Sequence, residues 1–160
     1  MKKMDITINN PKETESLAKI IGLVAEPGDN IILSGDLGAG KTTMTKGIAL
    51  GLGIEQMIKS PTYTIIREYQ QGRLPLYHMD VYRIENGADD LGLDEYFEGD
   101  GLSVVEWGKL LGEFLPTDYL DITLKKDFED MEKRVVSIQS FGTQAEKYLA
   151  RIQQKLEESI

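Results

Sequence analysis

At residues 31–42 the chain reads Ile31-Ile32-Leu33-Ser34-Gly35-Asp36-Leu37-Gly38-Ala39-Gly40-Lys41-Thr42. The part from Gly35 to Thr42 matches G-x-x-x-x-G-K-[ST], the pattern of loops that bind nucleotide phosphates. The apolar run before the loop is typical of a strand buried on both faces. After the loop, Met44, Ile48 and Leu52 recur at helical spacing. The order of strand, glycine-rich loop and helix therefore predicts an α/β protein with a phosphate-binding site at the loop.

The chemistry of such a loop gives each type of residue a task. Glycines allow backbone N–H groups to turn toward phosphate oxygens, and the helix N-terminus near Gly40 adds its partial positive charge. We expect Lys41 to reach the β- and γ-phosphates, Thr42 to offer its hydroxyl to Mg²⁺, and Thr43 to contact the α-phosphate. The residues predicted to bind the nucleotide here are Asp36, Gly38, Ala39, Gly40, Lys41, Thr42 and Thr43.

Two acidic residues end apolar runs that we expect to form strands beside this loop. Glu106 ends the run Leu102–Glu106, and Asp80 ends the run Leu76–Asp80. A phosphate loop needs such a carboxylate to hold Mg²⁺ directly or through water. Glu106 is predicted to do so, the alternative being a surface residue that merely follows a strand. Asp80 either binds the metal through water, orients the attacking water, or forms a turn or an ion pair with Arg83.

Three further features near these residues have two interpretations each. Trp107, the only tryptophan, either lies near bound nucleotide or packs in the core. His78, the only histidine, is flanked by apolar residues and is predicted to be a buried core residue rather than a catalyst. The segment Ser60–Thr64 is either a switch that senses the γ-phosphate or a proline turn that enters a threonine-rich strand.

The remaining pattern predicts elements on both sides of this centre. A helix is expected to begin after Asn10, with Pro11 at its first position and Glu13 completing a capping box, and Thr143 is expected to cap a last helix. Two antiparallel strand pairs are predicted, Thr62–Tyr69 with Leu76–Tyr82 and Tyr119–Leu124 with Arg134–Ser140. The chain, residues 1–160, is therefore predicted to be one domain with a P-loop NTPase-like three-layer α/β fold, whose mixed, mainly parallel central sheet carries additional antiparallel strands.

The composition limits the classes of function. Lys and Arg number 18 against 27 Asp and Glu, so the formal net charge is −9, which opposes unaided binding to nucleic-acid phosphates. The chain has no cysteine, which excludes disulfides and zinc–thiolate sites, so any metal is held by oxygen. Met1–Asn10 lacks a signal-peptide core and no apolar run approaches a membrane span, so we expect a soluble cytoplasmic protein. The acidic run Glu85–Asp100 is either a solvated face or a docking surface for a basic partner.

Four motifs together are more specific than the loop alone. They are Gly-Asp-Leu-Gly-Ala-Gly-Lys-Thr-Thr (35–43), Ser-Pro-Thr-Tyr-Thr (60–64), His-Met-Asp-Val-Tyr-Arg (78–83) and Val-Glu-Trp-Gly (105–108). With this order and spacing, and with a matching length, leading helix and C-terminal strands and helix, the chain closely resembles the TsaE (YjeE) family of bacterial P-loop ATPases.

The resemblance implies a role in making N6-threonylcarbamoyladenosine in tRNA. In that family TsaC makes threonylcarbamoyl-adenylate, the TsaB–TsaD pair transfers the group to tRNA, and TsaE docks on that pair and hydrolyses ATP to let it turn over. In this family the tRNA is then bound mainly by these partners. Carried over by position, Lys41 and Thr42 bind phosphate and Mg²⁺, Glu106 is the Mg²⁺ carboxylate, Asp80 supports hydrolysis, and residues 60–64 are the switch. Thr14 and Arg134 match positions near the nucleotide, although either Lys133 or Arg134 is the basic residue that approaches it.

Three other functions are alternatives to this one. A small-molecule kinase would use Asp80 as the base for an acceptor hydroxyl, but the chain has no arginine-rich lid segment. A GTPase would need a guanine-reading N/T-K-x-D motif, and Leu124-Lys125-Lys126-Asp127 lacks its first residue. A non-catalytic module would use the nucleotide only as a structural ligand while docking a partner. No arginine finger can be assigned among Arg67, Arg83 and Arg134, and if all three point away, hydrolysis by the chain alone should be slow.

Overall fold

The computed structural model describes residues 2–35, 39–55, 58, 66–81, 92–127 and 129–158. Its strands form a seven-stranded sheet in the order β1-β7-β6-β2-β5-β4-β3. Strands β6, β2, β5 and β4 run parallel to one another, whereas the outer pairs β1·β7, β7·β6 and β4·β3 are antiparallel. The predicted mixed sheet with a parallel centre is therefore confirmed. The strands are β1 (Lys3–Ile8), β2 (Asn30–Gly35), β3 (Ile66–Tyr69), β4 (Leu76–Asp80), β5 (Leu102–Glu106), β6 (Tyr119–Lys126) and β7 (Arg134–Phe141).

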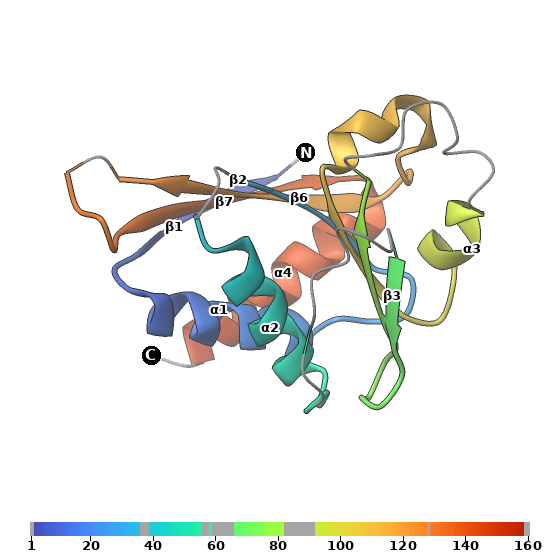
Figure 1. Cartoon of the computed structure of the whole chain (residues 1–160), viewed down its shortest axis with the longest axis horizontal. Helices are drawn as coiled ribbons and strands as arrows, with labels where there is room; N and C mark the ends of the chain where they lie inside the picture. The colour runs from blue at the N-terminus through green and yellow to red at the C-terminus, as the bar shows by residue number, and fades with distance from the viewer. Residues whose placement is uncertain are drawn as a thin grey trace.

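Helical segments cover both faces of this sheet. The helices α1 (Pro11–Leu23), α2 (Lys41–Gly51) and α4 (Thr143–Glu158) lie together on one face, and the shorter α3 (Leu93–Phe97) and the 3₁₀ segment η2 (Gly108–Phe114) pack on the other (Figure 1). Two hydrophobic cores result, one on each side of the sheet. None of the described helices is long and apolar enough to cross a membrane.

Strand β2 is buried on both faces, as its continuous apolar run predicts. Ile31 and Leu33 belong to the core under α1, α2 and α4, whereas Ile32 belongs to the core under α3 and η2. All three side chains are fully buried. Strands β5 and β6 lie parallel to β2 on either side of it. This central position fixes the point at which the chain leaves the sheet and enters the loop before α2.

Most predicted elements are present, with differences at their ends. Asn10 caps α1 by accepting a hydrogen bond from Glu13 N at 2.9 Å, but the Glu13 carboxylate accepts from Asn9 N rather than from Asn10 N. Thr143 is the first residue of α4 and not its cap, because Asp118 Oδ2 accepts from Gln144 N at 2.7 Å. The two predicted antiparallel pairs form, as β3 with β4 and β6 with β7. Residues 62–65 and 82, which are part of the predicted first pair, lie outside the described residues.

Helices α1 and α2 pack closely because glycines lie where they cross. A Cβ atom added to Gly22 would lie 2.1 Å from the carbonyl oxygen of Ile48, and one added to Gly47 would lie 2.5 Å from Ala18 Cβ. Real Cβ atoms do not approach other atoms so closely, so a larger side chain at either position would push the helices apart. The crossing holds α1 against α2, the helix that begins with Lys41 and Thr42, and thereby fixes the position of Thr14.

We expect Gly22→Ala to destabilise the fold by about 1–3 kcal/mol, the usual cost of overpacking. The sign of the stability change identifies the cause, because replacing glycine with alanine in an open helix stabilises the protein by roughly 0.5–1 kcal/mol. Urea unfolding followed by circular dichroism measures the change. Ser16→Ala, at an exposed position of the same helix, is the control and should leave the unfolding midpoint nearly unchanged. A Gly22→Ala protein as stable as the original would contradict the close crossing.

Candidate functional site

The start of α2 lies at the carboxyl end of β2, as the loop motif predicts. Gly40 is the residue before the helix and has φ 108°, a left-handed conformation that glycine adopts without steric strain. Among the described residues no side chain caps α2 at Gly40, so the first backbone N–H groups of the helix are available to an anion. Lys41 and Thr43 are partly exposed and Thr42 is exposed. The predicted contacts of Asp36 and Gly38 fall outside the described residues.

Asp80 and Glu106 lie side by side at the same edge of the sheet. Each is the last residue of its strand, and the parallel pairing of β4 with β5 places them directly opposite each other. The register of β2 with β5 pairs Glu106 with Leu33, two residues before Gly35. Both carboxylates therefore lie next to the point where β2 enters the loop. The carboxyl ends of the strands are also where open α/β sheets bind their ligands.

The oxygen groups at this edge suit Mg²⁺ better than a metal that prefers nitrogen or sulfur. The described part of the chain contains no cluster of three or more His, Cys, Asp or Glu side chains arranged for a metal. Mg²⁺ is commonly bound by one or two carboxylates together with substrate phosphates and water, not by an all-protein cage. Glu106, Asp80 and the exposed hydroxyl-bearing Thr42 fit that description.

Trp107 lies at the site and not in the core. It follows Glu106, is 46% exposed, and has φ 63°, which makes it the only non-glycine residue with a left-handed backbone in the described part of the chain. The Lys41 ammonium nitrogen lies 5.0 Å from the centroid of its ring, within the range of a cation–π interaction. Of the two interpretations of Trp107, the structure therefore excludes packing in the core. The strained backbone turns the indole ring toward α2.

A small pocket joins the residues that the family resemblance placed near the nucleotide. It has a volume of about 130 Å³ and lies beside the first turn of α2. Arg134 Nε donates a hydrogen bond to Ala39 O at 3.1 Å, which ties β7 to the loop. Lys133 instead pairs with Asp127, Nζ to Oδ2 at 3.8 Å, so Arg134 is the basic residue at the pocket. The lining residues are Pro11, Thr14, Ala39, Gly40, Thr43, Glu132 and Arg134.

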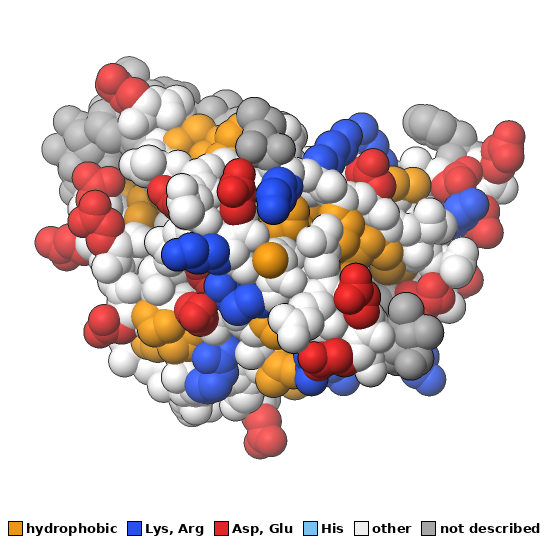
Figure 2. Space-filling view, turned by 180° about the vertical axis from the view of Figure 1, so that it is seen from behind, with side chains coloured by type: hydrophobic (Ala, Val, Ile, Leu, Met, Phe, Trp, Pro, Cys, Tyr) orange, Lys and Arg blue, Asp and Glu red, His pale blue; other side chains and the backbone are white. Residues whose placement is uncertain are grey.

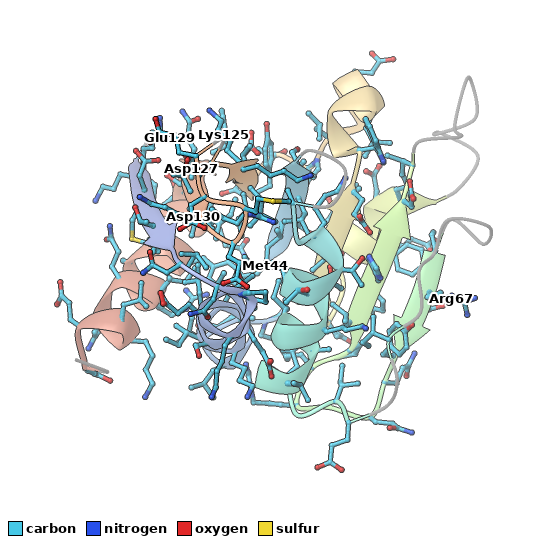
Figure 3. The ribbon with its side chains drawn as sticks, turned by 60° about the vertical axis from the view of Figure 1, so that its left-hand side comes forward. Met44, Arg67, Lys125, Asp127, Glu129 and Asp130 are labelled. Carbon is cyan, nitrogen blue, oxygen red and sulfur yellow. The ribbon has the colours of Figure 1, made fainter. Side chains whose placement is uncertain are left out.

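Two of the three finger candidates, Arg67 and Arg134, lie in the described part of the chain, and of these two only Arg134 lies at the pocket. Arg67 lies on the edge strand β3 and points outward from the sheet, away from Met44 in α2 (Figure 3). The guanidinium of Arg134 donates to the backbone carbonyls of Ala39, Met131 and Lys133. Arg83 lies outside the described residues, as does the predicted switch at residues 60–64.

Part of the predicted acidic run forms an exposed face around α3. Asp94, Glu95, Glu98 and Asp100 are all exposed, and Figure 2 shows acidic side chains gathered along the edge of the molecule where α3 lies. The earlier part of the run, residues 85–91, lies outside the described residues. This face lies away from α2 (Figure 1).

His78 is the site residue that the sequence interpretation missed. It is only 3% exposed, as predicted for a core histidine, but its Nε2 lies 2.8 Å from Glu106 Oε2. The pattern contains a partial signal for this contact, because His78 precedes Asp80 by two residues, and Asp80 and Glu106 are both predicted to end strands beside the loop. Side chains two residues apart on a strand share a face. The order of the strands in the sheet was needed to see which residue His78 would face.

A larger hollow lies at the opposite end of the sheet. It measures about 440 Å³ and is lined by residues at the amino ends of the parallel strands and in the nearby loops, among them Asn30, Phe97 and Asp118. Ligands of open α/β sheets bind at the carboxyl ends. The candidate site is therefore the smaller pocket together with the adjoining edge of Lys41, Asp80 and Glu106.

Strand β2 leading to helix α2, with two carboxylates on neighbouring parallel strands of a seven-stranded sheet, defines a mixed α/β protein. Comparison with known proteins agrees. The sequence model of the family described as "Threonylcarbamoyl adenosine biosynthesis protein TsaE" matches residues 8–136. The chain therefore belongs to the TsaE family.

Similar proteins cover between 71% and 96% of the chain. The tRNA threonylcarbamoyladenosine biosynthesis protein TsaE of Bacillus subtilis is 51% identical over 146 residues, which is 91% of each chain. The TsaE protein of Treponema pallidum is 43% identical over 116 residues, covering 71% of this chain and 85% of the relative. The crystal structure of Bacillus subtilis YdiB matches with a TM-score of 0.85 at 44% identity, covering 96% of both chains.

Proposed function

We propose that this chain is the ATP-hydrolysing component of the machinery that makes threonylcarbamoyladenosine in tRNA, and that it docks on TsaB–TsaD to sustain their turnover. Membership of the TsaE family supports the role in this biosynthesis. The convergence of Lys41, Asp80 and Glu106 at one edge of the sheet is the observation that carries the proposal of hydrolysis. TsaC acts earlier, by supplying threonylcarbamoyl-adenylate.

Each side chain at the edge takes one task in this mechanism. Lys41 and the first backbone N–H groups of α2 bind the β- and γ-phosphates. Thr42 and Glu106 hold Mg²⁺, which neutralises phosphate charge when it is bound. Asp80, partly exposed beside Glu106, accepts a hydrogen bond from the attacking water and orients it.

The pocket beside α2 binds the rest of the nucleotide. Thr14 and Thr43 contribute hydroxyl groups from two helices, and Arg134 supplies a positive charge. Trp107, which follows β5, holds the Lys41 ammonium group by a cation–π contact at the start of α2 before nucleotide binds. These four residues select and orient the nucleotide. Lys41, Asp80 and Glu106 act on the phosphates and the attacking water.

The positions of the described arginines support ATP hydrolysis that depends on partner proteins. An arginine that stabilises the transferring phosphoryl group is worth on the order of 10³–10⁵ in rate. Arg67 points away from the site, and Arg134 donates to backbone carbonyls. Neither of the two described candidates is placed as a finger, so we expect slow ATP hydrolysis by the chain alone and faster hydrolysis when it docks on TsaB–TsaD. The net charge of −9 supports a division of labour in which the partners hold the tRNA.

The test is steady-state ATP hydrolysis by the chain alone and with purified TsaB–TsaD. We expect slow turnover alone and a clear rise when the pair is added, with ATP preferred over GTP in competition. If ATP is hydrolysed at the same rate with and without the pair, the docking part of the proposal fails while the hydrolysis part stands. If neither condition gives hydrolysis above the Lys41→Ala blank, the proposal of an ATPase is wrong.

A further inference from the structure

His78 is a buried side chain with a single polar partner among the described residues. It lies on β4 and is 3% exposed. Its Nε2 is 2.8 Å from Glu106 Oε2, whereas its Nδ1 is buried and has no hydrogen-bond partner among the described residues. A buried ring nitrogen without a partner costs free energy. The orientation of the imidazole is therefore set by its contact with Glu106.

The register of the sheet explains why these two side chains meet. His78 pairs with Val104 and Asp80 pairs with Glu106, so Glu106 lies two residues further along the neighbouring strand. Residues two apart on a strand share a face, and the diagonal distance is within reach of long side chains. Both backbones are held by the central strands of the sheet, so the contact joins two rigid elements.

The chemistry of His78 and Glu106 determines which of the two side chains donates the hydrogen bond. A carboxylate has only acceptors, so Nε2 carries the hydrogen and donates it to Oε2. The Glu106 side chain is only 15% exposed, and a hydrogen bond to a charged group that is largely removed from water is stronger than one at the surface. The bond therefore fixes the rotation of the carboxylate and leaves Oε1 as the oxygen available to another ligand.

We propose that His78 is a positioning residue that orients Glu106 toward Mg²⁺. This inference rests on the proposed function, which makes Glu106 the Mg²⁺ carboxylate. Side chains that hydrogen-bond to a metal-binding group commonly change metal affinity by about 10–100-fold when they are replaced. His78 does not touch the nucleotide or the metal itself and acts only through the position of Glu106.

The experiment measures the Mg²⁺ concentration that half-saturates Mg²⁺-dependent ATP binding, followed by the fluorescence of Trp107, the only tryptophan. We expect His78→Leu to raise this concentration by about 10–100-fold and to leave ATP binding in EDTA unchanged. A matched pair then tests the donor. His78→Gln places an N–H near the position of Nε2 and should restore most of the Mg²⁺ affinity, whereas His78→Asn is too short to reach Glu106 and should behave like His78→Leu.

Two controls separate positioning from a general effect on the core. Met79→Leu changes the adjacent, fully buried residue of β4 at nearly constant volume and should leave the Mg²⁺ dependence unchanged. In a Glu106→Ala background, His78→Leu should have no further effect, because the group through which it acts is gone. If His78→Leu does not fold, the Gln and Asn variants still decide the question.

The outcomes distinguish this inference from the function on which it rests. If the original chain shows no Mg²⁺-dependent ATP binding, or Glu106→Ala does not alter it, the proposed role of Glu106 is wrong and the inference falls with it. If Glu106→Ala weakens the Mg²⁺ dependence but the His78 variants do not, only the inference is overturned. Equal shifts in the Gln and Asn variants would also overturn it, because the position of the donor would then have no effect.

Discussion

Replacing Lys41 with alanine should reduce partner-stimulated ATP hydrolysis by on the order of 10²–10³-fold, the usual effect of removing one preorganised group that stabilises transition-state charge. Lys41 opens α2 at the predicted phosphate site, and its ammonium group lies 5.0 Å from the Trp107 ring centroid. Alanine also favours the helix, and the lost cation–π contact is worth only about 0.5–1 kcal/mol. Phosphate release in the presence of TsaB–TsaD measures the loss at nearly unchanged stability.

Lys46→Ala is the matched control for this variant. Lys46 lies on the same helix and is exposed, so its replacement removes the same charge without touching the site. It should hydrolyse ATP as the original chain does. A Lys41→Ala protein that retains full hydrolysis would exclude this site as the ATPase centre. A protein that loses hydrolysis but still binds TsaB–TsaD would show that docking does not need the lysine.

The centre of the fold was predictable because its signals are local. A continuous apolar run, a glycine-rich loop and a helical repeat follow one another within residues 31–52, and each element has an unambiguous pattern. Strand β1 was missed because Lys3–Ile8 is an edge strand with alternating exposed residues. Its pairing with β7 joins residues more than 120 positions apart and has no local signal. The short α3 and the segment η2 were missed because they contain too few turns for a helical period.

In the candidate site, too, the features with a local sequence signal could be predicted, and those that depend on the order of the strands could not. Glu106 and Asp80 could be predicted because each ends an apolar strand, and that pattern alone places a carboxylate at the carboxyl edge of a sheet. Their direct pairing depends on the order of strands β2, β5 and β4, which the chain does not reveal locally. The contact of His78 with Glu106 follows from that register. The exposure of Trp107 follows from its left-handed backbone, which residue type does not predict.

The position of Arg134 shows how distant segments complete the pocket. It begins β7, on the far side of β6 from β2, yet its guanidinium reaches Ala39. The hairpin of β6 and β7 extends beyond the central strands, and Figure 3 shows Asp127, Glu129 and Asp130 gathered near its turn. Pairing of Lys133 with Asp127 turns that lysine away. The hairpin thus decides which of two adjacent basic side chains lies at the pocket beside α2.

Replacing Glu106 with glutamine should reduce Mg²⁺-dependent ATP hydrolysis by about 10²-fold, because metal stabilisation of phosphoryl charge is worth several kcal/mol and each 1.36 kcal/mol is about tenfold in rate. Glutamine preserves the shape of the side chain, and its carbonyl oxygen can still accept the hydrogen bond from His78. The substitution therefore removes the charge that attracts Mg²⁺ while keeping the geometry of the edge. Hydrolysis rates measured across a range of Mg²⁺ concentrations report the change.

The dependence on Mg²⁺ separates a metal-binding role from a structural one. If Glu106 holds the metal, raising the Mg²⁺ concentration should recover part of the rate in Glu106→Gln, and the midpoint of thermal unfolding should stay close to that of the original chain. Glu113→Gln, at an exposed position of η2, removes the same charge nearby and should alter neither quantity. An unchanged Mg²⁺ dependence in Glu106→Gln would remove this residue from the metal site and leave Asp80, its neighbour across the strand pair, as the carboxylate that binds the ion.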